Sequence, residues 1–178
     1  TIRYPDWPNT PKAQFYIGQL YAIQDNLSKA RDEFEVVVKD YPTSSDVCAN
    51  SLFMIAMIYE KEDNWQSAQE NLDRIVRDYP DTGPALQVPI YIAVHYKSKG
   101  QTAEADAAYI AALDKYKKMV ADNPNTYGAL MAIDFTVACY GDQGKWEEAI
   151  TYLASVAADH GDTLLASKSI FVTGAIYQ

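Results

Sequence analysis

An internal repeat is the feature that most restricts how this chain can fold. A small residue, a tyrosine three positions later and an alanine nine positions after that recur along the sequence. The four full copies are Gly18, Tyr21, Ala30; Ala56, Tyr59, Ala68; Ala93, Tyr96, Ala105; and Val137, Tyr140, Ala149, while Gly174 and Tyr177 begin a fifth. Successive copies start 38, 37, 44 and 37 residues apart. A period in this range is typical of a stack of similar supersecondary units.

Each copy contains two stretches with apolar residues at helical spacing, separated by a short polar or glycine-containing break such as "QDN" or "SKGQT". This pattern predicts an antiparallel helical hairpin in every repeat. Where two helices cross closely, a side chain larger than alanine would hold the backbones apart. The first residue and the alanine of each copy are therefore expected at helix crossings, with the large residues Phe34, Leu72, Tyr109 and Leu153 filling the space between hairpins.

Numbering from the start of each hairpin, the small residue is at position 8, the tyrosine at 11, the alanine at 20 and the large apolar residue at 24, and Pro42 and Pro80 occupy position 32. This arrangement resembles the tetratricopeptide repeat over residues 11–178. The resemblance implies an all-α fold, a right-handed α-solenoid of antiparallel helical hairpins, whose repeats bind other proteins. Residues 1–10 are expected to form an extended segment, followed by repeats at about 11–48, 49–85, 86–129 and 130–166 and a half repeat at 167–178.

Some repeats depart from the pattern. Val137 is larger than the other residues at position 8 and predicts a slightly more open or rotated fourth hairpin. Pro89 is expected either to start or to kink its helix. A long helix over 102–121 is predicted in the third repeat, and its lysines are either a contact surface or solvated. Trp65 and Trp146 share position 17 and are expected to pack under the hairpin turn.

The repeats are mostly longer than the roughly 34 residues of a standard tetratricopeptide unit. The extra residues follow the proline, in "TSSDVCAN" and "DTGPAL", and predict longer connectors. Such connectors resemble those of bacterial envelope proteins, including the outer-membrane assembly lipoprotein and the periplasmic partner of the Tol-Pal system. This second resemblance implies a periplasmic or outer-membrane-associated protein, with a cytoplasmic location as the alternative. The initial Thr1 is expected to reflect a processed or trimmed product of a longer protein.

Composition argues against several classes of partner. A net charge of −9 would repel a phosphate backbone, so no nucleic-acid partner is expected. No run of about 18 apolar residues is present, so no membrane span is expected. Cys48 and Cys139 are flanked by apolar residues and are expected to be small buried side chains.

No catalytic constellation is recognisable, and we expect neither enzymatic activity nor a cofactor or metal. His95 lies in a helical stretch beside Tyr96, and His160 replaces the connector tyrosine that Tyr79 provides elsewhere. The string "DHGD" at 159–162 matches no zinc pattern.

In a solenoid of this kind, positions 5 and 9 of each first helix point into the concave groove. The predicted groove residues that would bind a peptide or a partner helix are Phe15, Gln19, Phe53, Met57, Ile90, Val94, Asp134, Ala138 and Phe171. They include no lysine or asparagine, so a clamp for the acidic C-terminus of a chaperone is not expected. In the alternative interpretation the apolar groove is structural, filled by a tight superhelix or by the segment around Tyr4 and Trp7, or stacked on a larger domain.

The last stretch, 164–178, is a predicted first helix with apolar residues on most of its faces. We expect either that the natural protein continues or that this helix pairs with another molecule, such as a second copy of the chain.

Overall fold

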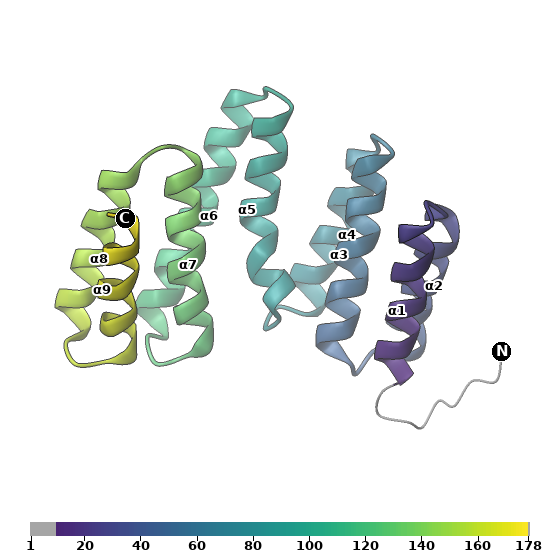
Figure 1. Cartoon of the computed structure of the whole chain (residues 1–178), viewed down its shortest axis with the longest axis horizontal. Coiled ribbons are helices and arrows are strands. Elements are labelled where there is room, and N and C mark those ends of the chain that lie inside the picture. Colours follow the sequence, from purple (N-terminus) through teal and green to yellow (C-terminus); the bar gives the residue numbers. More distant parts are fainter. Residues whose placement is uncertain (1–9, 178) are drawn as a thin grey trace. The chain divides into compact units, whose positions relative to one another are not determined.

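The computed structural model describes residues 10–177, which fold into α-helices joined by short turns (Figure 1). The predicted segment containing Tyr4 and Trp7 lies outside the described residues. The helices of the described part are α1 Thr10–Ile23, α2 Leu27–Asp40, α3 Ser45–Lys61, α4 Trp65–Asp78, α5 Gly83–Ser98, α6 Thr102–Asp122, α7 Tyr127–Asp142, α8 Trp146–His160 and α9 Leu164–Ile176. The predicted all-α helical repeat fold is confirmed.

The chain divides into two compact units, an N-terminal unit that ends at Val88 and a C-terminal unit that begins at Pro89. The N-terminal unit contains hairpin 1 (α1 and α2) and hairpin 2 (α3 and α4). The C-terminal unit contains most of hairpin 3 (α5 and α6), hairpin 4 (α7 and α8) and α9. Pro89 lies inside α5, which begins six residues earlier, so this proline does not start the helix.

All four hairpins close with the same backbone turn. The carbonyl of the repeated tyrosine accepts a hydrogen bond from the amide five residues later, for example Tyr59 O from Asn64 N at 2.8 Å and Tyr140 O from Lys145 N at 2.8 Å. The residue before that amide has a positive φ, as in Asp63 at 61° and Gly144 at 71°. This is the Schellman arrangement, which satisfies the last carbonyls of the first helix.

The packing positions behave as the repeat predicts. The alanines at position 20 and the large residues at position 24 are buried in every hairpin. Gly18 illustrates why position 8 is small, because a Cβ built there would lie 2.6 Å from Cε1 of Phe34. At the equivalent place in hairpin 2, Ala56 is fully buried. These contacts form the core of each hairpin.

The expectation of longer connectors is wrong. The link between α2 and α3 consists of residues 41–44, and the link between α4 and α5 consists of residues 79–82. In each link the amide of the fourth residue donates to the carbonyl of the first (Ser44 N to Tyr41 O, 2.9 Å; Thr82 N to Tyr79 O, 3.2 Å). The extra residues continue from this turn as the first turns of α3 and α5. The added length therefore extends the first helix of the hairpin instead of loosening the link.

The long α6 packs within the C-terminal unit. Tyr116 is fully buried and stacks on Phe135 of α7 at a centroid distance of 5.4 Å. Lys117 donates a 2.7 Å hydrogen bond to the Tyr140 hydroxyl and lies over the rings of Tyr140 and Tyr152. Burial also lowers the pKa of Lys115. One side of this helix is thus an internal contact surface, whereas Lys118 is exposed and forms an ion pair with Asp122.

Candidate binding surface

In the N-terminal unit, the predicted groove residues range from core to surface. Phe53 is 8% exposed, and Phe15 is partly buried with its ring 5.3 Å from that of Phe34. Gln19 is also partly buried. Met57 is 44% exposed and is the one apolar side chain of this set that is open to solvent. The predicted positions therefore combine a packed floor with a single exposed thioether.

In the C-terminal unit, more of the predicted residues are open. Val94 is 42% exposed and Phe171 is 77% exposed, while Ile90 is partly buried against the core. Asp134 is exposed and forms an ion pair with Lys168 at 2.6 Å. Ala138 is exposed as well. The structure does not itself show that any of these residues contacts a partner, and their role in binding stays a prediction.

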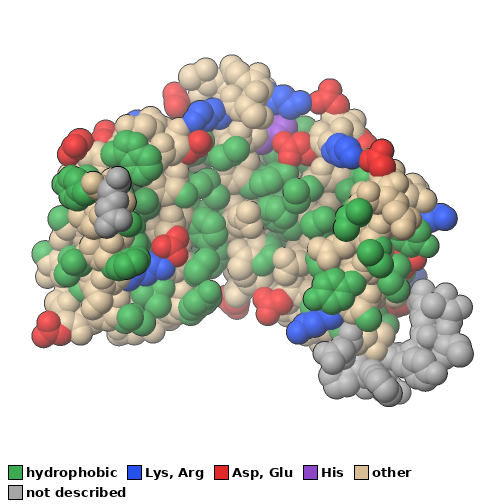
Figure 2. Space-filling model, viewed as in Figure 1, with side chains coloured by type: hydrophobic (Ala, Val, Ile, Leu, Met, Phe, Trp, Pro, Cys, Tyr) green, Lys and Arg blue, Asp and Glu red, His purple; other side chains and the backbone are tan. Residues whose placement is uncertain are grey.

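The first helices also expose apolar side chains that positions 5 and 9 do not include. Figure 2 shows apolar side chains gathered over α1 and α3 in the N-terminal unit and over α7 and α9 in the C-terminal unit. Large apolar residues of α1 and α9 that are exposed are Tyr16, Ile17, Leu20, Ile23, Leu164 and Ile170. Counting repeat positions 5 and 9 did not identify the exposed apolar residues of α1. The sequence did offer a sign of them, because the residues of this helix are apolar on most of its faces.

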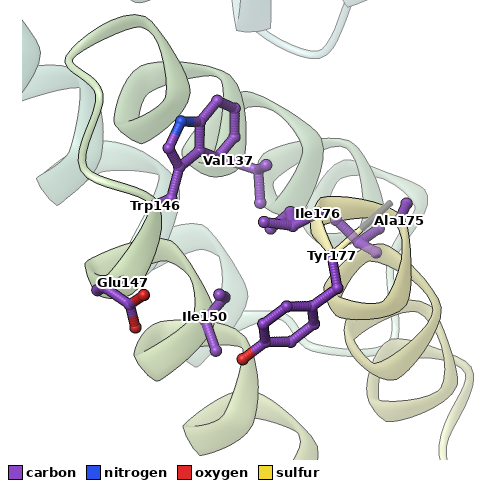
Figure 3. Close-up of a pocket in the computed structure, with 8 residues that line it drawn as sticks. Val137, Trp146, Glu147, Ile150, Ala175, Ile176 and Tyr177 are labelled. Carbon is purple, nitrogen blue, oxygen red and sulfur yellow. The ribbon is translucent and has the colours of Figure 1, made fainter.

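A pocket of about 480 Å³ lies among α7, α8 and α9 (Figure 3). Trp146 and Tyr177 stand on opposite sides of it, with Val137 and Ile176 between them and Glu147 at its edge. The Trp146 ring lies directly on the backbone of Gly141, where any Cβ would overlap it. Trp146 thus packs against the end of α7 next to the hairpin turn while it remains about half exposed, and Trp65 at the same repeat position is partly buried.

Ion pairs join successive hairpins near their turns. In the N-terminal unit, Arg31 contacts Glu62 at 2.6 Å and lies over the Tyr59 ring, and Lys61 contacts Asp25 at 2.7 Å. The hydrogen bond to Glu62 raises the pKa of Arg31 further above its usual value. Exposed pairs of this kind each contribute little to stability.

The histidines and cysteines lie on different helices, and most of them are buried. His95 is buried next to Tyr96, with ring centroids 5.6 Å apart, and His160 ends α8. Both cysteines are buried and free, as predicted, and burial raises the pKa of the Cys139 thiol to about 12. Across residues 10–177, no three His, Cys, Asp or Glu side chains gather in a way that could hold a metal ion.

Within the described part of the chain, none of the helices has both the length and the apolar content needed to cross a bilayer.

Comparisons with known proteins agree with this architecture. Two solved structures of nearly identical TPR-like repeats, from a Podosopora anserina protein described as a kinesin light chain, are similar to the chain. One of them, a single-substitution variant, shows 19% identity and a TM-score of 0.51 and covers 100% of this chain and 88% of that one. The other shows 18% identity and a TM-score of 0.49 and covers 97% and 88%. For the structure with a TM-score of 0.51, the likeness at this identity concerns the fold alone.

No curated protein sequence matches the chain. The sequence model of the tetratricopeptide repeat matches residues 12–44, 50–82 and 138–163, which together are slightly more than half of the chain. The unmatched stretch between 83 and 137 contains the long α6 and the displaced proline Pro124. Hairpins 1 and 2 and most of hairpin 4 thus carry the family pattern, and the chain belongs to the tetratricopeptide repeat family.

Proposed function

We propose that this chain is a non-catalytic scaffold that binds a peptide or a partner helix through the apolar faces of its first helices. Tetratricopeptide repeats generally mediate protein–protein interaction, which supports the class of function. The groove as the place of binding is our own inference from the exposed side chains of each unit.

The observation that carries the proposal is the exposure of large apolar residues at the predicted groove positions. Met57, Val94 and Phe171 are each at least 42% exposed, although the helices that carry them have buried faces of their own. Within each unit, large apolar side chains left exposed on a packed helix are characteristic of interaction surfaces. A partner that covered them would gain roughly 25 cal/mol for every Å² of apolar surface removed from water.

The predicted residues then divide into two roles. Phe53 and the partly buried Phe15 and Ile90 form the floor, since they already pack against their own unit. Met57, Val94 and Phe171 would contact the partner. A preformed floor of this kind lowers the entropy lost on binding because few side chains need to be ordered.

A peptide library selected on the intact chain tests the proposal. For a selected peptide that binds the N-terminal unit, Met57→Ser is expected to weaken binding at least tenfold in fluorescence anisotropy, with an unchanged melting temperature. For one that binds the C-terminal unit, Val94→Ser is expected to have the same effect. Phe53→Ser is unsuitable as a probe, because Phe53 belongs to the core and its loss would unfold the unit.

The matched control is Ile110→Ser, which removes a 62% exposed apolar side chain from α6, a second helix. Binding that survives both first-helix variants and is lost in Ile110→Ser would place the interaction on the opposite set of helices and contradict the proposal.

A second candidate function is assembly, in which the chain stacks on another copy or on a larger domain. The exposed Leu164, Ile170 and Phe171 of α9 favour it. Sedimentation equilibrium is expected to show a concentration-dependent dimer that Phe171→Ser dissociates and Ile110→Ser does not. A monomer at all concentrations would count against self-association.

We also propose a bacterial envelope setting, which the "YPTS" and "YPDT" strings at 41–44 and 79–82 support by their resemblance to envelope proteins. Fractionation of the source cell with an antibody to this chain is the test. Recovery in the periplasmic or outer-membrane fraction agrees with the proposal, and recovery with the cytoplasmic proteins contradicts it.

A further inference from the structure

The repeated tyrosine at position 11 lies under a positively charged side chain in three copies of the repeat. The pairs, with the distance from the charged group to the ring centroid, are Lys29 and Tyr21 at 5.4 Å, Arg31 and Tyr59 at 4.8 Å, and Lys117 and Tyr140 at 5.2 Å. A cation at such a distance is attracted by the negative charge on the face of an aromatic ring. A cation on this tyrosine is thus a recurrent contact of the fold.

Tyr177 is the repeated tyrosine of the last, half copy, and no lysine or arginine of the described residues lies over its ring. The pocket of about 480 Å³ among α7, α8 and α9 borders this side chain instead (Figure 3). Tyr177 is 72% exposed, so its ring is open to a molecule from solution. The contact that the chain itself makes at Tyr59 is therefore available to a partner at Tyr177.

Hairpins 1 and 2 show how such a cation is held. Arg31, at position 21 of hairpin 1, lies over Tyr59 of the next hairpin and contacts the Glu62 carboxylate at 2.6 Å. Position 21 of hairpin 4 is Ile150, which lines the pocket together with Tyr177 of the next copy. The C-terminal unit thus repeats the tyrosine but has an uncharged side chain where the N-terminal unit has an arginine.

Trp146 and Glu147 supply the other parts of a site for a cation. The Trp146 ring stands across the pocket from Tyr177 and packs on the backbone of Gly141. Glu147 lies at the edge of the pocket, and its carboxylate forms no ion pair with a described residue. An arginine side chain fits this combination, because its planar guanidinium stacks on aromatic rings while its carbon chain packs on apolar walls.

The charges around the pocket favour a cation over an anion. Glu147 and Glu148 lie in the first turn of α8, and their two negative charges outweigh the partial positive charge of a helix N-terminus. Lys145, which precedes this turn, lines the neighbouring pocket and not this one. The chain as a whole carries a net charge of −9, which attracts basic partners.

We propose that this pocket binds an arginine side chain of a partner polypeptide. The guanidinium packs against the rings of Trp146 and Tyr177 and pairs with the Glu147 carboxylate. The carbon chain of the arginine packs against Val137 and Ile150. None of these residues belongs to the predicted groove residues, so the site stands apart from the groove and is tested separately.

The probe is a capped Gly-Gly-Arg-Gly-Gly peptide, titrated into the isotope-labelled intact chain while the indole N–H signal of Trp146 is followed by NMR. A saturable shift of that signal is expected. In the matched peptide, citrulline replaces arginine and keeps its length and shape without its charge. The citrulline peptide is expected to bind at least tenfold more weakly. A citrulline peptide that binds as tightly would overturn the proposal, as would an arginine peptide that leaves the Trp146 signal unchanged at millimolar concentrations.

Variants of the chain locate the bound arginine. Glu147→Gln and Tyr177→Leu are each expected to weaken binding of the arginine peptide at least threefold, with an unchanged melting temperature because both side chains are exposed. Glu148→Gln is the matched control, since it removes the same charge one residue away and Glu148 does not line the pocket. It is expected to change binding by less than twofold.

Two results contradict the assignment. If Glu147→Gln and Glu148→Gln weaken binding equally, the peptide responds only to the general negative charge of the chain. If Met57→Ser or Val94→Ser abolishes binding of the arginine peptide while Glu147→Gln preserves it, the peptide lies in the groove and not in this pocket.

Discussion

Hairpins 1 and 2 reach the same backbone turn as hairpins 3 and 4 by opposite chemical means. In the first two, the residue with positive φ is Asp25 or Asp63, and the next residue is an asparagine whose side chain caps the following helix. In the last two, the positive φ belongs to Gly100 or Gly144. The residues that follow, Gln101 and Lys145, make no side-chain capping bond.

The two kinds of turn differ in which term costs free energy, the backbone strain or the missing helix cap. An aspartate in the left-handed region is strained by roughly 1 kcal/mol, whereas glycine adopts it freely. An asparagine cap stabilises a helix by about 1 kcal/mol, and its absence forgoes that amount. Two different sequences are therefore compatible with the same turn at a similar free-energy cost, because strain and capping nearly offset each other.

The glycines that meet aromatic rings show a second contrast. Gly18 faces the ring of Phe34, which is fully buried and has no room to move. Gly141 faces the ring of Trp146, which is about half exposed and borders an open pocket. The same type of contact is thus rigid in the N-terminal unit and adjustable in the C-terminal unit.

The largest effect is expected for Gly18→Ala. Its methyl group would overlap the buried Phe34 ring, and overpacking of this kind costs about 1–3 kcal/mol. Urea unfolding followed by circular dichroism measures the change. Gly141→Ala is expected to cost less than about 1 kcal/mol, because the Trp146 ring can move outward, with a shift in tryptophan fluorescence as the sign of that movement.

Gly174→Ala is the matched control, since nothing lies within 4 Å of a Cβ at that position. It is expected to be neutral or to stabilise by up to about 1 kcal/mol through helix propensity. Equal losses at Gly18 and Gly141 would remove the distinction between a rigid and an adjustable contact.

The next largest effect is expected for removal of the N-terminal cap of α4. Asn64 accepts a 3.2 Å hydrogen bond from the amide of Ser67, so Asn64→Ala is expected to lose about 1 kcal/mol of unfolding free energy. Gln101→Ala in hairpin 3 removes no capping bond and is expected to change stability by less than about 0.5 kcal/mol. A comparable loss in both variants would show that the asparagine acts through something other than capping.

A smaller net effect is expected when the turn of hairpin 2 is transplanted into hairpin 4. Gly144→Asp alone is expected to destabilise by about 1 kcal/mol, and Lys145→Asn alone to stabilise by a similar amount. The double variant is then expected to lie within about 0.5 kcal/mol of the original chain, as measured by the same urea unfolding. A double variant that falls well outside this range would mean that strain and capping are not independent.

The two buried cysteines are expected to affect the stability of the two units equally at neutral pH. At alkaline pH they are expected to destabilise the two units to different degrees. Burial raises the pKa of Cys139 to about 12, and it also raises that of Cys48, which the contact with Tyr79 partly counteracts. The unfolded thiol, with an ordinary pKa of 9.0, ionises first. The stability from the buried neutral thiol is thus complete below about pH 9 and is lost as the pH rises toward 12.

Unfolding under reducing conditions at several alkaline pH values tests this. Cys139→Ala is expected to flatten the alkaline loss of stability more than Cys48→Ala. An equal or larger effect of Cys48→Ala would mean that the two thiols are not buried to the degree that their surroundings indicate.

Much of the hairpin structure could be predicted from the sequence, because the burial of a repeat position is set by local spacing. The alanines at position 20 and the large residues at position 24 are examples, and all are buried. The predicted groove residues do not follow so simply. Phe53 and Met57 lie one helical turn apart on α3 and were both predicted to face the groove, yet Phe53 is buried and Met57 is 44% exposed.

Tyr109 shows the same limit. The substitution of tyrosine for a purely apolar residue at position 24 is visible in the sequence. That its hydroxyl is buried without a hydrogen-bond partner among the described residues is not visible there, since this depends on the packing of the folded unit.

The sequence by itself determined the helical hairpin, its turn and its tight crossings, because these depend on residues fewer than about twenty positions apart. Only the tertiary structure decided that the extra residues lengthen α3 and α5, that Lys117 lies over two tyrosine rings, and which apolar side chains stay exposed. Those outcomes depend on contacts between hairpins. The period of a repeat specifies how each hairpin is built, but the side chains that differ from copy to copy determine what each contact surface leaves uncovered.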